Sequence, residues 1–75
     1  MISAAQCRMA RAALDWSAQR LADAAGVGVA TINRFERSAR MTTAENVEAI
    51  RGALEFAGIE FIPENGGGAG VRLKK

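Results

Sequence analysis

Hydrophobic residues recur every three or four positions through the first 58 residues, a spacing that predicts amphipathic helices. We expect four helices, over about 3–14, 17–26, 28–37 and 42–58, because start and stop signals fall at these points. The residues that carry the signals are Ser3 with Gln6, Ser17, Gly26, and Thr42 with Glu45, Thr43 being an alternative cap.

After Gly58 the pattern changes to alternation. Ile59-Glu60-Phe61 and Val71-Arg72-Leu73 flank a glycine-rich run, which predicts a β-hairpin. A two-stranded hairpin is barely stable alone, so it must pack on the helices or on a partner subunit. We divide the chain into a helical domain, 1–58, and a hairpin extension, 59–75, and expect the extension to be a dimerisation element.

Composition bounds the function. Seventy-five residues make one small domain, and with no histidine and one cysteine, Cys7, both a disulfide and a metal site are unexpected. With no second cysteine and no secretory leader, we expect a cytoplasmic protein. The hydrophobic runs are too short to cross a bilayer, so we expect no membrane contact. Residues 1–44 hold six arginines against three acids, whereas residues 45–75 are close to neutral. This asymmetry suggests an anionic partner on one face.

The second and third predicted helices are joined by a glycine turn at Gly26. Two short helices held at a steep angle can present one of them to the major groove of DNA. On a wheel at about 100° per residue, Ile32 and Phe35 mark the buried side of the third helix. The opposite side carries Ala30, Asn33, Arg34 and Arg37. Arginine can pair with guanine and asparagine with adenine, although a polar face also suits any solvated surface helix.

Glu36 falls beside the buried side of that helix, where it would not meet DNA phosphates. Arg11 lies similarly beside the apolar stripe of the first helix. We expect these two residues to form an ion pair that ties the first helix to the third. The alternative, two separate solvated surface charges, stays open at this point.

The run from Trp16 to Val27 followed by Thr31-Ile32-Asn33-Arg34-Phe35-Glu36 resembles the helix-turn-helix of the Xre/Cro/λ-repressor-like regulators, over roughly residues 5–58. The tail from Ala57 to Leu73 is similar to small bacterial members that add a short β extension. The resemblance implies a mainly α fold, a λ-repressor-like bundle of four helices plus a C-terminal hairpin. It also implies operator binding as a homodimer, with the third helix in the major groove of double-stranded DNA.

Mapped onto this chain, the resemblance assigns two sets of contacts. The base-reading positions are Gly28, Val29, Ala30, Asn33 and Arg34; the backbone positions are Gln19, Arg20, Thr31, Arg37 and Arg40; the family's arginine–glutamate tie falls on Arg11 and Glu36. Two departures matter. Ala18 stands where the family often has a phosphate-binding glutamine, and the residues at 28–30 lack the family's usual hydrogen-bonding groups. Direct readout then depends on Asn33 and Arg34, which predicts a short or tolerant recognition sequence.

Other functions are less well supported. An enzyme is not expected, because histidine and tyrosine are absent and Cys7 lies on the predicted core side, where it acts as a small hydrophobe. The sequence points to no cofactor and no small-molecule ligand. We therefore expect a transcriptional regulator, and a repressor rather than an activator. The rival is the antitoxin of a toxin–antitoxin pair, which would bind its own operator and cover a toxin through the hairpin edge.

Overall fold

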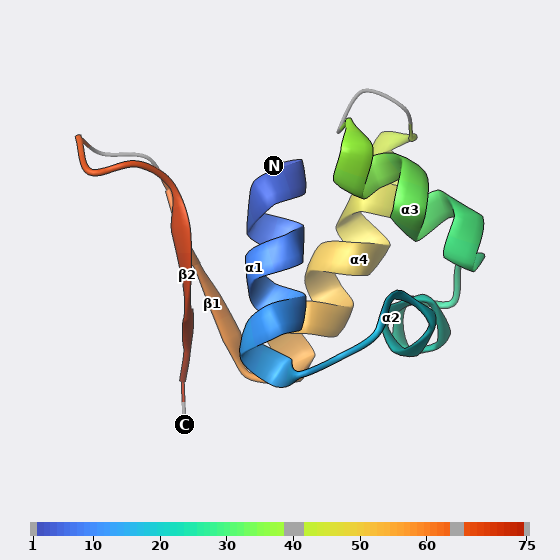
Figure 1. The fold of residues 1–75 in the computed structure, drawn as a ribbon, viewed down its shortest axis with the longest axis horizontal. Helices are drawn as coiled ribbons and strands as arrows, with labels where there is room; N and C mark the ends of the chain where they lie inside the picture. The colour runs from blue at the N-terminus through green and yellow to red at the C-terminus, as the bar shows by residue number, and fades with distance from the viewer. Residues whose placement is uncertain (1, 39–41, 64–65, 75) are drawn as a thin grey trace.

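The computed structural model describes residues 2–38, 42–63 and 66–74. Its elements are α1 (Ala4–Leu14), α2 (Ala18–Ala25), α3 (Val29–Arg37), α4 (Ala44–Phe56), β1 (Ile59–Ile62) and β2 (Gly70–Leu73). Figure 1 shows the four helices gathered on one side and the hairpin beside α1. The predicted mainly helical fold with a C-terminal hairpin is therefore confirmed, with each strand one residue longer than predicted.

Local capping explains where the helices begin. Ser3 and Gln6 form the predicted capping box at α1, and the Ser17 hydroxyl accepts the amide of Arg20 at α2. Gly26 adopts the left-handed conformation, φ 71°, that ends α2 and turns the chain into α3.

At α4 the structure selects the alternative cap. Thr43 is the cap residue in place of Thr42, and its hydroxyl accepts the amide of Asn46 at 3.1 Å. This one-residue shift moves the third helical position from Glu45 to Asn46, so the predicted Thr42–Glu45 capping box does not form. The Thr42 hydroxyl instead accepts the side-chain amide of Asn46 at 3.2 Å.

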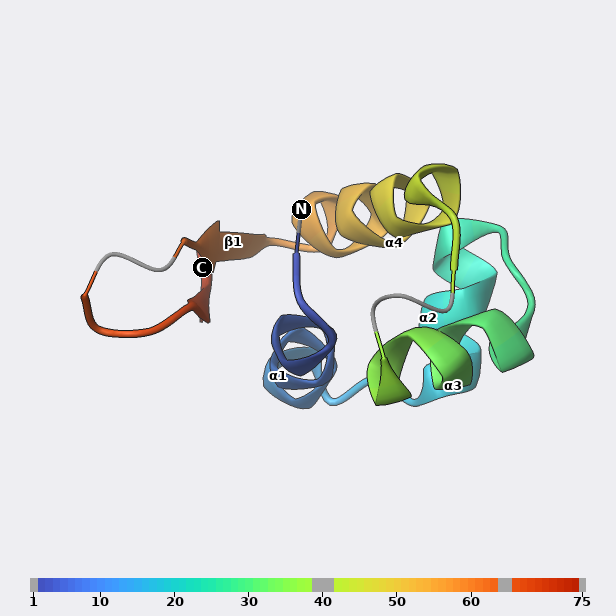
Figure 2. The same cartoon turned by 90° about the horizontal axis from the view of Figure 1, so that it is seen from above.

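Eleven hydrophobic side chains are buried in the described part of the chain, and all four helices and β1 contribute to this core. They are Ile2, Cys7, Ala10, Leu21, Ala22, Ile32, Phe35, Val47, Ile50, Leu54 and Ile59. α3 packs on α2 and α1, while α4 closes the opposite side of the bundle (Figure 2). Burial of one side of α3 leaves its other side free.

The hairpin packs on its own subunit. β1 and β2 are antiparallel, and Phe61 pairs with Val71 on the side that contacts the core. The buried side chain of Gln6 contacts the hairpin where β1 ends and β2 begins. Its amide donates to the carbonyls of Ile62 at 3.2 Å and Gly70 at 3.0 Å. The sequence left open whether the hairpin packs on the helices or on a partner subunit, and the structure shows that it packs on the helices.

The hairpin and α3 lie at opposite ends of the molecule. Both views place the hairpin on the side of α1 that faces away from α2 and α3 (Figures 1 and 2). The long axis of the subunit, along which these elements are separated, measures 32 Å. Any contact through the hairpin therefore acts far from α3.

Candidate nucleic-acid interface

The inner side of α3 is fixed by the core. Ile32 and Phe35 are completely buried against the other helices. The residues on the opposite side of α3 are exposed: Ala30, Asn33, Arg34 and Arg37. Neither Asn33 nor Arg34 has a side-chain hydrogen bond or ion pair within the described residues. Their amide and guanidinium groups are thus available to an external partner.

The first turn of α3 is less polar and partly enclosed. Gly28 is the cap residue and makes no side-chain cap hydrogen bond. It is exposed, and a Cβ at this position would meet nothing within 4 Å. Val29 is half-buried and packs against the core, and Thr31 is also half-buried. Among the residues at the start of α3, Ala30 presents the most open side chain, and its small size permits close approach.

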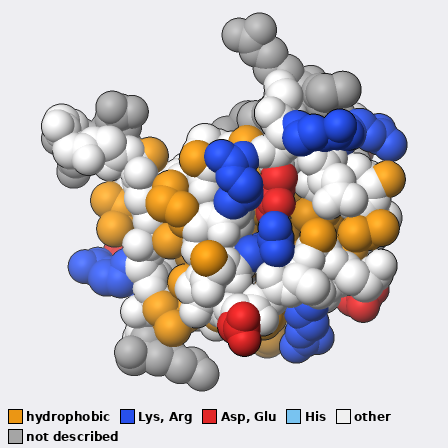
Figure 3. All heavy atoms as spheres, viewed as in Figure 1, with side chains coloured by type: hydrophobic (Ala, Val, Ile, Leu, Met, Phe, Trp, Pro, Cys, Tyr) orange, Lys and Arg blue, Asp and Glu red, His pale blue; other side chains and the backbone are white. Residues whose placement is uncertain are grey.

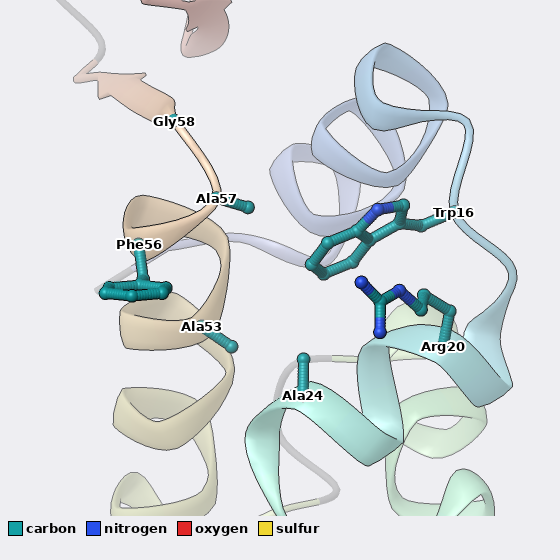
Figure 4. Close-up of a pocket in the computed structure, with 7 residues that line it drawn as sticks. All are labelled: Trp16, Arg20, Ala24, Ala53, Phe56, Ala57 and Gly58. Atoms are coloured by element: carbon teal, nitrogen blue, oxygen red, sulfur yellow. The ribbon is translucent and has the colours of Figure 1, made fainter.

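The residues expected to contact the DNA backbone are dispersed. Gln19 donates its side-chain amide to Asp23, 3.0 Å away on the same helix. Arg20 points into a groove between α2 and α4, with its guanidinium carbon 4.8 Å from the centre of the Trp16 ring (Figure 4). Arg37 belongs to the last turn of α3, and Arg40 lies outside the described residues. The structure therefore brings Arg37, but not Arg20, to the outer side of α3.

An ion pair joins α1 to the last turn of α3. The guanidinium of Arg11 donates to both carboxylate oxygens of Glu36, from Nε to Oε2 at 2.7 Å and from Nη2 to Oε1 at 2.8 Å. Arg11 also donates to the carbonyl of Trp16 at 2.9 Å. One side chain thus links α1, the segment before α2, and α3. Two parallel N–H···O bonds fix the direction as well as the distance between the groups.

Buried charge is stabilised here by several donors. Burial would raise the pKa of Glu36, but hydrogen bonds from Arg11 and Cys7, with the positive charges of Arg11 and Arg8, outweigh burial and hold this pKa below its ordinary value. The hydrogen bond to Glu36 raises the pKa of Arg11. The carboxylate therefore stays ionised inside the protein.

Sequence reasoning did not find the third member of this cluster. The Cys7 thiol donates to Glu36 Oε2 at 3.3 Å. Burial, followed by the hydrogen bond and the negative charge of Glu36, raises the pKa of Cys7 to about 12. The thiol is thus a protonated donor as well as a core hydrophobe. The available signal was the spacing of Cys7 and Arg11, which are one helical turn apart on α1.

Arg8 is a second residue that was missed. Its guanidinium donates to the main-chain carbonyl of Glu36, at the C-terminal end of α3, although Arg8 belongs to α1. A cation at this position satisfies a terminal carbonyl and offsets the negative end of the helix dipole. On the face seen in Figure 3, basic side chains border α3 and the neighbouring part of α1. Arg34 and Arg37 on α3 and Arg8 on α1 are all exposed, and Arg8 contacts the last turn of α3.

Other kinds of site are not found in the residues that the structure covers. No three histidine, cysteine, aspartate or glutamate side chains gather into a possible metal site within residues 2–38, 42–63 and 66–74. In the same residues, no helix has the length and apolar character that a membrane span requires.

The comparison with protein families agrees with this geometry. A family model described as helix-turn-helix matches residues 8–59, which include α2, the Gly26 turn, α3 and α4. The search of curated proteins gave no match. Because the model covers well over half of the chain, the chain belongs to the helix-turn-helix family of the Xre/Cro/λ-repressor-like type.

Proposed function

We propose that this protein is a transcriptional regulator that binds duplex DNA in a sequence-specific manner, with α3 in the major groove. The observation that supports this proposal is the contrast between the two sides of α3. Its inner residues are completely buried, and its outer side offers the unpaired polar groups of Asn33 and Arg34. A rigidly held helix with arginine and asparagine on its free side matches the way that base edges are read.

The proposed contacts divide by chemistry. Asn33 and Arg34 read bases, and Ala30 allows close approach; Gly28 and Val29 complete the base-facing set. Gln19, Thr31, Arg37 and Arg40 complete the proposal as contacts to the DNA backbone, whereas Arg20 is left out of this set because it faces the groove between α2 and α4. Because the start of α3 offers few polar side chains, we expect recognition to be concentrated on the bases opposite Asn33 and Arg34.

The test compares binding to a selected duplex and to random DNA. Arg34→Ala is expected to lose about 1–3 kcal/mol on the selected duplex and much less on random DNA, because a base contact is lost. Arg72→Ala is the matched control, since Arg72 is an exposed arginine on the hairpin that pairs with Glu60. Equal losses on both DNAs for Arg34→Ala would overturn the assignment.

We infer that regulation is repression and that the protein acts as a cytoplasmic homodimer. Occupancy of an operator is sufficient to exclude other proteins from DNA, whereas activation needs a further contact. A dimer would read a two-fold operator, each subunit occupying one half-site. That residues 59–75 form the dimer contact, or that they bind a toxin, stays a prediction from the sequence.

A further inference from the structure

A groove of about 570 Å³ lies between the start of α2 and the end of α4, apart from the outer side of α3. Figure 4 shows Trp16, Arg20 and Ala24 along one wall and the α4 residues along the other. The α4 wall is made by Ala53, Phe56, Ala57 and Gly58. Small side chains on both walls keep the groove open.

Phe56 stands on the lip of this groove with 96% of its surface exposed. Its ring projects from α4 without covering Ala53 or Ala57 (Figure 4). The exposed fraction of Phe56 is far above that of Met9 or Leu73, the other large exposed hydrophobic residues of the described chain. An open aromatic ring beside an apolar groove is typical of a surface that a partner covers.

Charge on the two walls is complementary. Arg20 faces the groove, and within the described residues it has no acidic partner, only the Trp16 ring. The α4 wall ends in the negative pole of the helix dipole, while the nearby Glu55 carboxylate is already paired with Arg51 on the same helix, at 2.9 Å. A surface that carries a cation beside its hollow and the negative end of a helix dipole beside its projection can match a second copy of itself.

We propose that the groove is the two-fold contact between two copies of this chain, the Phe56 ring of each copy entering the groove of the other. A two-fold contact requires one patch that is complementary to itself. Here the projecting ring and the hollow that would receive it lie side by side on one subunit. This contact buries both rings and places the α4 end of each copy near Arg20 of the other.

The position of α3 favours this surface over the hairpin, an argument that rests on the proposed binding to two half-sites. Half-sites one DNA turn apart have centres about 34–36 Å from each other. A two-fold axis at the hairpin edge would leave the α3 helices at the far ends of a dimer about twice as long as the 32 Å subunit. One wall of the groove belongs to α2, and α3 packs against α2. A two-fold contact through the groove would therefore place the two α3 helices closer together than a contact through the hairpin.

The size of the contact indicates a weak dimer. A phenylalanine side chain contributes about 150–250 Å² of buried surface, so two rings and an equal area of the groove walls that receive them give a total of about 600–1,000 Å². Only the upper end of that range reaches the size of a specific interface. We therefore expect a dimer whose population rises with protein concentration and with binding to two adjacent half-sites.

Sedimentation of the DNA-free protein over a range of concentrations tests the proposal. Phe56→Ser should raise the dimer dissociation constant by about 100-fold or more, because two rings are lost per dimer. The ring contacts little within its own subunit, so thermal unfolding should change little. Ala24→Phe should also separate the subunits by filling the groove from within. Leu73→Ser, which changes a partly exposed hydrophobic residue of the hairpin, is the control and should remain dimeric.

A wild-type protein that stays monomeric at every concentration would overturn the proposal, as would a dimer that Phe56→Ser leaves intact. Dissociation by Leu73→Ser alone would assign the contact to the hairpin instead. The outcome is separable from the proposed function, because binding to a duplex with one half-site needs no dimer. If Phe56→Ser binds that duplex as tightly as wild type while Arg34→Ala does not, DNA binding stands whatever the fate of the groove.

Discussion

Replacing Glu36 by glutamine tests the ion pair that holds α3 against α1. The substitution keeps the shape of the side chain and removes its charge, so that Arg11 loses a bidentate anionic partner. Breaking a buried pair by removing one charge costs about 3–5 kcal/mol. The Glu36 side chain is 9% exposed and that of Arg11 is 23% exposed, and Arg11 retains the Trp16 carbonyl. We therefore expect Glu36→Gln to lower the free energy of unfolding by about 3 kcal/mol, the lower end of that range.

A loss of this size is large for a chain of 75 residues. Domains are stable by roughly 0.05–0.15 kcal/mol per residue, which gives about 4–11 kcal/mol here. Each kcal/mol shifts the melting temperature of a domain of this size by about 4–8 °C. Thermal unfolding followed by circular dichroism should therefore show a fall of roughly 12–24 °C for Glu36→Gln, and urea unfolding should show the same loss of free energy.

The pH dependence has a definite sign. Because the pKa of Glu36 is lowered in the folded protein, its contribution is complete above the unfolded value, about 4.3, and is lost as pH falls through the folded value. Wild type should therefore lose more stability than Glu36→Gln on acidification from about pH 5 to pH 3. The exposed Glu48 and Glu60 also have lowered pKa values, but both proteins share them and they cancel in the difference.

A double variant controls for the burial of the site. Replacing both partners, Arg11→Met with Glu36→Leu, should recover most of the stability, because no unpaired buried charge remains. The reasoning is refuted if Glu36→Gln loses less than about 0.5 kcal/mol, the range of ordinary surface substitutions. It is also refuted if acid destabilises both proteins equally.

Three further substitutions test the neighbouring contacts. Cys7→Ala should lower the free energy of unfolding by about 1–3 kcal/mol, because a hydrogen bond is lost and a small cavity is left. The wild-type thiol has a pKa of about 12, so at pH 8 it should react with a thiol reagent only as fast as the protein opens. Arg8→Met should reduce the salt dependence of binding to random DNA by about one unit of slope, because Arg8 is exposed at the last turn of α3, where we expect it to contact a phosphate. Gln6→Leu should cost about 1–3 kcal/mol and speed hydrogen exchange of the β2 amides, while amides of α3 stay protected.

Local chemistry made most of the fold predictable. Helix ends depend on residues within one turn of each other, so Ser3, Ser17 and Gly26 could be assigned from the sequence. Adjacent threonines at 42 and 43 have the same local chemistry, so the sequence left both open as caps of the fourth helix. The structure selects Thr43, and the capping box predicted for Thr42 with Glu45 does not form.

Contacts between distant segments were predictable only where two features agreed. The Arg11–Glu36 pairing followed from the positions of both residues beside apolar stripes. Gln6 had a complete local explanation as a capping residue, which hid its long-range hydrogen bonds to the hairpin. Arg20 was counted with the other arginines because charge counts do not specify direction, and only the packing of α2 shows that it stacks on Trp16.

In the interface that we propose, recognition and stability are separated on α3 by side of the helix. Ile32, Phe35 and Glu36 bind the helix to the rest of the subunit, and each is buried. Asn33 and Arg34 point away and contribute nothing to the core or to the ion pair. Substitution on the outer side can therefore change which bases are read without lowering the free energy of unfolding, whereas a change at Glu36 alters the direction in which the whole outer side is presented. A variant at Glu36 should thus weaken binding to every operator sequence, and only variants at Asn33 or Arg34 should change the order of preference among them.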